Sequence, residues 1–306
     1  MSKALIIENI SHCYDGRMAL EDLTLSVAAG EILALLGPSG CGKTTALRLI
    51  AGLETLQSGS IKIEGDLVAG HGTHMAPEAR GVGLVMQDFA LFPHMTVARN
   101  ISFGLAHLPK SEREEIVTEQ LELIGLAERA GAHPHMLSGG EQQRVALARA
   151  LAPSPRIMLM DEAFSSLDVA TRTSLRDASR AVLKSRNVPT LMVTHDAEEA
   201  LQMGDIIAVM RDGKLVQCGD AASLFNAPAD EFVMALFGAV NRFEGVIRDG
   251  AVVTPFGALK FNDGQEGEKV NVFFHRDSLV LDGAGVRSEV ISLKNMGGHM
   301  RAEIAP

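Results

Sequence analysis

The chain of 306 residues is 46% hydrophobic, which is enough to bury more than one core, so two or three domains are expected. A net charge of -10 and a pI near 5.5 argue against binding along nucleic acid, which usually needs a clustered basic surface. The longest apolar runs have strand length, far below the roughly 20 residues that cross a bilayer. With three scattered cysteines and no secretion-signal pattern, the sequence predicts a soluble protein of a reducing cytoplasm.

The first part of the chain reads as strands followed by helices. Alternating apolar positions in ALIIENISHCY and LTLSVAAG predict antiparallel strands, and EILALLG predicts a buried strand that runs into a glycine-rich loop. A helix is expected over 44–51, with further strands in IKIEGDLV and over 81–87. From about 88 to 157 helix formers with helical periodicity indicate an inserted helical subdomain, in which the charged helix over 111–122 presents a solvated face.

Strands then alternate with helices. The segments RIMLMDE, PTLMVTH and DIIAVMRDGKLVQCG are separated by expected helices over 169–184 and 197–203, which predicts a parallel α/β sheet. Such sheets bind ligands at the carboxyl ends of their strands. After residue 237, short β segments indicate a small β domain over 238–306. Its last expected strand, MRAEIA, reaches the end of the sequence, so we expect a short or truncated domain.

A phosphate-binding loop is predicted by GPSGCGKTT. Its glycines let backbone N–H groups approach phosphates, Lys43 reaches the β and γ oxygens, and Thr44 ligates Mg²⁺. A chance glycine turn is a weak alternative, because strand, loop and helix occur in the required order. At Cys41 an acidic thiol is conceivable, but a small residue suffices there. We expect the nucleotide to be held by Gly37, Pro38, Ser39, Gly40, Cys41, Gly42, Lys43, Thr44 and Thr45.

Two carboxylates follow the buried strand IMLMD. We interpret Asp161 as a partner of Mg²⁺, through water or the second coordination shell, and Glu162 as the general base that polarises the attacking water. The alternative is that both acids only end a strand.

A second phosphate cradle is indicated by LSGGEQQR, in which a glycine-rich turn opens a helix. One nucleotide hardly needs two such cradles. We therefore infer that two copies of the chain share nucleotides, and that the partner's nucleotide contacts Ser138, Gly139, Gly140 and Glu141.

Taken in order, these motifs resemble the ATP-binding subunit of an ABC transporter over roughly residues 5–237. The resemblance implies an α/β P-loop NTPase (RecA-like) core with an antiparallel β subdomain. It further implies that Gln87 senses Mg²⁺ and water, that Asp168 in SSLD contacts nucleotide, that His195 lies near the γ-phosphate and that Tyr14 stacks on adenine. Each role has an alternative: His195 caps a helix, Gln87 ends a strand, or Tyr14 is a half-buried strand residue.

Two positions depart from the family pattern. The chain has Glu141 where glutamine is most usual, and Ala163 where proline commonly follows the glutamate. Because the Ser-Gly-Gly core and the reacting groups remain, activity is expected to survive.

The resemblance implies a motor that closes as a homodimer on ATP and reopens after hydrolysis. Its expected partners are integral membrane permease subunits and, indirectly, an extracytoplasmic substrate-binding protein, so the chain is expected at the cytoplasmic face of the membrane. Apolar residues in 87–105 are expected to dock the permease. In the alternative, Phe89, Leu91 and Phe92 pack inside the helical insertion.

The small β domain resembles the OB-like regulatory domain of importers for ferric iron, polyamines, sulfate and sugars. Overall likeness favours ferric iron, although no residue here contacts the cargo, and His275 and His299 are interpreted as ordinary histidines.

Two other classes of protein are alternatives. A soluble ABC ATPase without membrane partners would be expected to have a coiled-coil insertion or tandem cassettes, and a P-loop kinase would leave LSGGEQQR, SSLD and VTHD without a role.

Overall fold

The computed structural model describes residues 3–165, 169–254, 257–261, 264–275, 289–295 and 300–305. The chain forms two compact units, residues 1–229 and 230–306. The first is built on a six-stranded sheet of order β11-β10-β3-β9-β8-β7, in which all neighbours are parallel except the edge pair β10 and β11. Its strands are β3 (Ile32–Leu36), β7 (Val82–Val85), β8 (Ile157–Asp161), β9 (Thr190–Thr194), β10 (Ile206–Arg211) and β11 (Lys214–Gly219).

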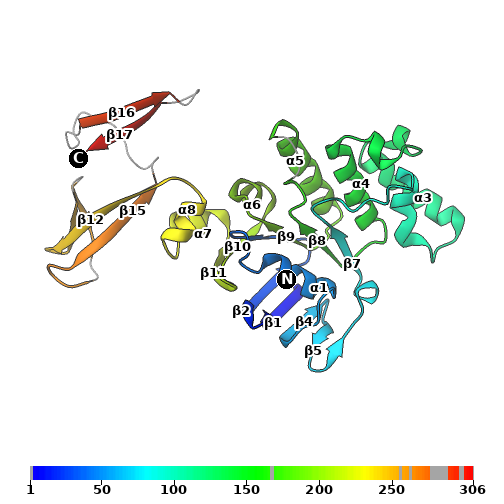
Figure 1. Cartoon of the computed structure of the whole chain (residues 1–306), viewed down its shortest axis with the longest axis horizontal. Coiled ribbons are helices and arrows are strands. Elements are labelled where there is room, and N and C mark those ends of the chain that lie inside the picture. The colour runs from blue at the N-terminus through cyan, green and yellow to red at the C-terminus, as the bar shows by residue number, and fades with distance from the viewer. Residues whose placement is uncertain are drawn as a thin grey trace. The chain divides into compact units, whose positions relative to one another are not determined.

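Helices cover both faces of this sheet, which explains why β3 and β9 are buried along their whole length. α1 (Lys43–Ala51) contacts β8 and β9 on one face, and α6 (Ala197–Met203) contacts β3 and β9 on the other. Figure 1 shows α1 on one side of the sheet and α5 (Val169–Ser185) with α6 on the other. The expected parallel α/β core is confirmed.

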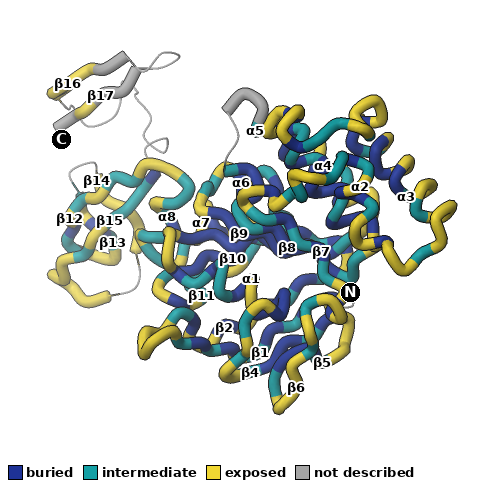
Figure 2. Tube along the Cα trace, turned by 45° about the vertical axis from the view of Figure 1, so that its right-hand side comes forward, coloured by how far each residue is buried: buried dark blue, intermediate teal, exposed yellow. Residues whose placement is uncertain are grey.

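A second sheet, antiparallel throughout, has the order β2-β1-β4-β5-β6. Side chains of this sheet and of the six-stranded sheet share one hydrophobic core with α1. Figure 2 shows buried stretches along β1 and β4 as well as along β8 and β9. The strands are β1 (Lys3–Tyr14), β2 (Arg17–Ala28), β4 (Ser58–Ile63), β5 (Asp66–Gly70) and β6 (Thr73–His74).

Two segments that we expected as single strands are hairpins. IKIEGDLV divides into β4 and β5 at Glu64 and Gly65, with φ of 49° and 88°. DIIAVMRDGKLVQCG divides into β10 and β11 at Asp212 and Gly213, with φ of 51° and 79°. Two consecutive residues of positive φ form the tight turn that matches the twist of paired strands, so an acidic residue followed by glycine reverses the chain.

The helical insertion follows β7 and contains its own hydrophobic cluster. α4 contacts β7, and Figure 1 shows α3 and α4 beyond that edge of the six-stranded sheet. In the described part of the chain, no helix combines the length and the apolar character needed to cross a membrane. The helices of this insertion and the short helices elsewhere in the first unit are η1 (Pro77–Ala79), α2 (Val97–Ser102), η2 (Phe103–Leu105), α3 (Lys110–Leu123), η3 (Ala127–Arg129), η4 (Pro134–Met136), α4 (Gly139–Leu151) and α7 (Ala221–Asn226).

The second unit contains a four-stranded antiparallel sheet of order β14-β13-β12-β15 and a hairpin of two further strands. It begins before the expected boundary at 238 and includes α8, which contacts β12. His275 is buried at the end of β15, whereas His299 lies outside the described residues. The elements are α8 (Glu231–Leu236), β12 (Val240–Arg248), β13 (Ala251–Thr254), β14 (Gly257–Lys260), β15 (Lys269–His275), β16 (Glu289–Asn295) and β17 (Met300–Ala305).

Candidate nucleotide site

The phosphate-binding loop joins β3 to α1, and its glycines are required by the packing around it. At Gly42, the N-cap of α1, φ is 103° and a Cβ atom would lie 2.3 Å from the carbonyl oxygen of Ala19. A Cβ atom on Gly37 would lie 2.3 Å from the carbonyl oxygen of Met210. Any larger residue at these positions would displace the loop. Because glycine has no side chain, a phosphate can approach the backbone N–H groups at the start of the helix.

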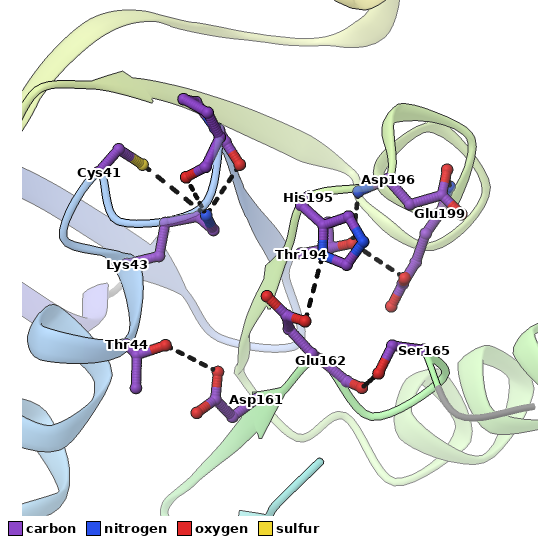
Figure 3. A network of polar contacts seen from close by, with 12 residues as sticks. Cys41, Lys43, Thr44, Asp161, Glu162, Ser165, Thr194, His195, Asp196 and Glu199 are labelled. Carbon is purple, nitrogen blue, oxygen red and sulfur yellow. Dashed lines mark hydrogen bonds and ion pairs between the residues drawn. The ribbon is translucent and has the colours of Figure 1, made fainter.

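Lys43 is the first residue of α1 and its side chain is folded over the loop. Its Nζ donates hydrogen bonds of 2.8 Å to the carbonyl oxygens of Gly37 and Pro38 and lies 3.7 Å from Sγ of Cys41. Figure 3 shows this cluster. The ammonium group therefore lies over the loop, and once it leaves these two carbonyl oxygens it can join the N–H groups of the loop in binding the triphosphate of ATP.

Cys41 is 4% exposed, and burial raises the pKa of its thiol. A buried, protonated thiol is a poor nucleophile. The structure thus favours the reading in which Cys41 is the small residue that the loop needs.

Thr44 and Asp161 bring two oxygen groups together from α1 and β8. The Thr44 hydroxyl donates to Oδ1 of Asp161 over 3.3 Å. Burial raises the pKa of Asp161, and the hydrogen bond from Thr44 offsets only part of that effect. A half-buried carboxylate beside a hydroxyl offers the hard oxygen ligands that Mg²⁺ prefers, so these residues fit the ion.

Glu162 is held in an uncommon backbone conformation next to His195. Its φ is 45°, its N–H donates to the carbonyl of Val193 over 3.0 Å, and its carbonyl accepts bonds of 3.1 and 2.8 Å from the N–H and hydroxyl of Ser165. Its Oε2 lies 3.1 Å from Nδ1 of His195 (Figure 3). The carboxylate and the imidazole therefore face each other at the edge of the sheet where Asp161 ends β8.

Gln87 lies just beyond β7, after Met86, and is exposed. Beyond it, Phe89 and Ala90 have φ of 61° and 45°, and their carbonyl oxygens accept bonds of 2.9 and 2.6 Å from the guanidinium of Arg149 on α4. Sequence reasoning missed Arg149. A basic residue among the apolar positions of α4 was the available signal.

Tyr14 ends β1 and is 38% exposed, with its ring edge-on to the buried ring of His12 at a centroid distance of 4.6 Å. His12 thus supports one part of the Tyr14 ring and leaves another part open to solvent. Such an aromatic surface can stack on a base. Sequence reasoning did not single out His12.

Ser138 is the N-cap of α4 and forms a capping box with Glu141. The Glu141 N–H donates to the Ser138 hydroxyl over 3.3 Å, and Oε2 of Glu141 accepts from the N–H and hydroxyl of Ser138 over 2.8 and 2.9 Å. Glutamate at position 141 therefore makes the helix start that glutamine would also make.

The two phosphate cradles open different helices in different parts of the first unit. One begins α1 between the two sheets, and the other begins α4 in the helical insertion. Within the described residues, no hydrogen bond or ion pair joins 137–144 to 37–45. Asp168 lies outside the described residues.

Comparisons with known proteins identify the family. The ABC transporter family model matches residues 20–165. The spermidine/putrescine import ATP-binding protein PotA of Salmonella typhimurium is 41% identical over 275 residues, which cover 89% of this chain and 70% of that protein. The chain belongs to the ABC transporter family. A sulfate/thiosulfate import ATP-binding protein, CysA 1 of Chromobacterium violaceum, is also 41% identical, over 97% of this chain and 85% of that protein.

Solved structures of this family have the same fold. The chain of cbiO1 from Clostridium perfringens, part of the ABC transporter complex cbiONQ, is 26% identical with a TM-score of 0.68 and covers 75% of this chain and 93% of its own. A dimeric ATP-binding cassette with bound ADP and Pi is 29% identical with a TM-score of 0.63, over 71% of this chain and 98% of its own. The expected P-loop NTPase fold and the ATPase activity, with ATP and Mg²⁺, are confirmed.

Proposed function

We propose that this ATPase powers an importer by closing as a homodimer on ATP and reopening after hydrolysis. The observation that carries the proposal is the pair of glycine-containing helix starts at Gly42 and Ser138, which belong to different parts of one unit. Each ATP would lie between the phosphate loop of one copy and the signature segment of the other, defined as residues 137–142. Binding energy then favours the closed dimer, and loss of the γ-phosphate favours its opening.

In the phosphate loop we assign electrostatic roles to Lys43 and Thr44. Lys43 would neutralise the β and γ oxygens, and the backbone over 37–42 would donate to the phosphates. Thr44, Asp161 and Gln87 would hold Mg²⁺, which supplies charge neutralisation to the departing phosphate oxygens. Burial raises the pKa of Asp161, and a bound cation would favour the ionised form that coordinates it.

Glu162 would accept a proton from the attacking water, and His195 would orient the Glu162 carboxylate and lie beside the γ-phosphate. The 3.1 Å contact between Oε2 and Nδ1 supports this pairing, since a base must be held within hydrogen-bond reach of the proton it takes. Tyr14 would stack on adenine. The signature segment and Asp168 would complete the site of the partner copy.

The coupling surface for a permease would be the aromatic pair of Phe92 and Phe103. Phe103 is 54% exposed, and the ring centroids of the two residues are 4.4 Å apart. Phe89, in contrast, is buried, and Leu91 packs against the hydrophobic cluster of the helical insertion. Docking on a permease would place the chain at the cytoplasmic face of the membrane.

The proposal also concerns the solute that the importer transports. The two named relatives import polyamines or sulfate and thiosulfate, and both are 41% identical to this chain. These cargoes have opposite charge, and the equal identities do not choose between them. We propose a small charged solute of the polyamine or sulfate class. These relatives give no support to the expectation that the cargo is ferric iron.

The second unit, residues 230–306, would regulate the ATPase.

The dimer model is tested by Glu162→Gln. This variant keeps the nucleotide contacts but lacks the base, so we expect hydrolysis to stop and a dimer to accumulate on size-exclusion chromatography with Mg²⁺ and ATP. Lys43→Ala, as the matched control, should stay monomeric because it binds the phosphates weakly. A Glu162→Gln protein that remains monomeric at saturating ATP contradicts the shared site.

The cargo is tested in proteoliposomes that contain the permease, with this chain and ATP in the lumen and the substrate-binding protein outside. Uptake of labelled spermidine, sulfate and ferric ion should be compared with and without ATP. We expect ATP-dependent uptake of spermidine or sulfate. Uptake of ferric ion alone would overturn the proposed cargo class and leave the ATPase mechanism intact.

A further inference from the structure

A buried charge network lies beside the loop that carries His195. Arg176 of α5 is 2% exposed, and its Nη2 donates to Oδ2 of Asp196 over 2.7 Å and lies 3.4 Å from Oε2 of Glu199. The Thr194 hydroxyl donates to the same Glu199 oxygen over 2.9 Å. Both chain neighbours of His195 are therefore tied, directly or through Glu199, to one arginine of another helix.

Asp196 uses both carboxylate oxygens and its own N–H. Oδ1 accepts from the N–H groups of Glu198 and Glu199 as the N-cap of α6, Oδ2 accepts from Arg176, and the Asp196 N–H donates to the Thr194 hydroxyl over 3.0 Å. Figure 3 shows Thr194, Asp196 and Glu199 gathered around His195. Although burial acts to raise the pKa of Asp196, hydrogen bonds led by that from Arg176 hold it below its ordinary value.

Arg172, one turn earlier on α5, connects this network to the other side of the site. Its Nη1 lies 3.8 Å from Oδ2 of Asp196, and its Nη2 donates to the carbonyl oxygen of Ser165 over 3.4 Å. Ser165 in turn donates to the carbonyl of Glu162. The contacts form a closed ring that runs from Glu162 through Ser165, Arg172 and Asp196 to the adjacent His195, and back to Glu162 across 3.1 Å.

We propose that Arg172 and Arg176 of α5 are positioning residues for hydrolysis, which set the placement of His195 against Glu162 by holding Asp196. The inference rests on the roles proposed above for Glu162 and His195. Among the described residues, the two arginines contact Asp196, Glu199 and the carbonyl of Ser165. They act on the peptide backbone that carries the imidazole, and small errors in the placement of a catalytic group reduce rate steeply.

Stability alone is a weak explanation for this network. A buried ion pair often contributes little net stabilisation, because desolvation of both charges opposes their attraction. Here Nε of Arg176 and Oε1 of Glu199 are buried without a hydrogen-bond partner, which adds to that cost. The arrangement does, however, impose one geometry on 194–196, and catalysis requires that geometry.

The first test is steady-state ATPase kinetics of purified full-length Arg172→Ala. Arg172 is partly exposed, so the variant should fold. We expect kcat to fall about tenfold, with the KM for ATP within about twofold of wild type. Arg172→Lys should recover part of kcat. The matched control is Arg180→Ala on the same helix, whose contacts are with Asp205 and Met203 and not with the ring; it should keep kcat within about twofold.

The second test is a double-mutant cycle with Asp196→Asn, which retains a capping side chain but removes the charge. We expect Arg172→Ala to have little further effect on kcat in that background. Wild-type kcat in Arg172→Ala, or equal losses in Arg172→Ala and Arg180→Ala that follow their melting temperatures, would overturn the inference. Independent, multiplicative losses in the cycle would do the same. If instead Glu162→Gln retained wild-type hydrolysis, the proposed function itself would fail.

Discussion

Oε2 of Glu162 lies 3.1 Å from Nδ1 of His195, although the two residues come from the ends of different strands. β8 and β9 are parallel neighbours, with Asp161 paired to Val193, so the residue after each strand emerges at the same edge of the sheet. The left-handed backbone of Glu162 turns its side chain toward the imidazole and is held there by bonds to Val193 and Ser165. This pair is the centre of the proposed chemistry.

Replacement of His195 by alanine should reduce kcat by about 10²-fold or more, because the carboxylate of Glu162 would lose its oriented partner. Nucleotide binding should persist, since Lys43 and the loop are unchanged. Steady-state hydrolysis and binding of a fluorescent ATP analogue measure the two effects. His74→Ala, on the exposed edge strand β6, is the control. Near-normal turnover in His195→Ala would remove the histidine from the mechanism.

Ser138 has two separable roles, and two substitutions distinguish them. Ser138→Ala removes the N-cap and should cost about 1 kcal/mol of stability, whereas Ser138→Asn keeps a capping side chain and should cost little. Both lack the hydroxyl that the partner's phosphate would contact, so both should slow hydrolysis about tenfold or more. Thermal melts and ATPase rates test this. Normal hydrolysis in Ser138→Asn would show that capping is the only role of the side chain.

Arg149 holds the segment after Gln87 in a strained turn. Positive φ at Phe89 and Ala90 costs about 1–2 kcal/mol each, and the guanidinium fork accounts for two bonds that oppose this cost. Arg149→Ala should therefore relax the turn, raise amide exchange over 88–91 about tenfold and displace Gln87, with a lower kcat. Hydrogen–deuterium exchange measures the first effect. Unchanged exchange over these residues would contradict it.

A companion substitution tests the strain itself. Ala90→Gly should stabilise the chain by up to about 1 kcal/mol, because glycine adopts positive φ without a Cβ penalty. Denaturant unfolding of the variant and the wild type measures the change. A destabilised Ala90→Gly protein would show that the alanine methyl group matters more than the backbone strain.

The carboxylate of Asp205 makes the free energy of unfolding depend on pH in the acidic range. Its carboxylate accepts bonds from Arg180, Lys184 and the N–H of Ile32 over 2.7, 2.8 and 2.9 Å. Burial acts to raise its pKa, but the hydrogen bonds led by that from Lys184 outweigh it and lower the pKa in the folded state. Asp205→Asn should cost about 1–2 kcal/mol near pH 7, a range reduced because the group is partly exposed.

The sign of this pH dependence follows from the lowered folded pKa. The contribution of Asp205 is complete above its unfolded pKa of about 3.9 and is lost as the pH falls through the lower folded value. The difference in unfolding free energy between wild type and Asp205→Asn should therefore be constant from about pH 7 to pH 5 and shrink below pH 4. A difference that grows in acid would contradict the assignment.

The order of motifs along the chain predicted the core of the site, because each motif is local. The loop over 37–45 follows β3, the acidic pair lies at the end of β8, and His195 follows β9; parallel strands bring their carboxyl ends to one edge of the sheet. The hairpins at Glu64 and Asp212 were not predicted, although the glycine that follows each acidic residue is a turn signal, most clearly in the Asp-Gly pair.

The contacts of Arg172, Arg176 and Arg149 were not predicted from the sequence. Each arginine contacts residues at least seven positions away, up to 60 for Arg149 and Phe89, and its partner is a backbone carbonyl or a carboxylate of another element. Periodicity shows that a position on a helix faces inward. It does not show which group lies there.

By itself, therefore, the sequence determined the reaction class of this protein. Phosphates bind where glycines and a lysine are close in sequence, and hydrolysis needs a carboxylate at the end of a strand. Only the tertiary structure decided how Glu162 and His195 are held together. That geometry depends on α5, whose arginines reach the site through folding of the chain and not through proximity in sequence. Long side chains with several hydrogen-bond donors have many possible partners, and the packing of the fold selects one.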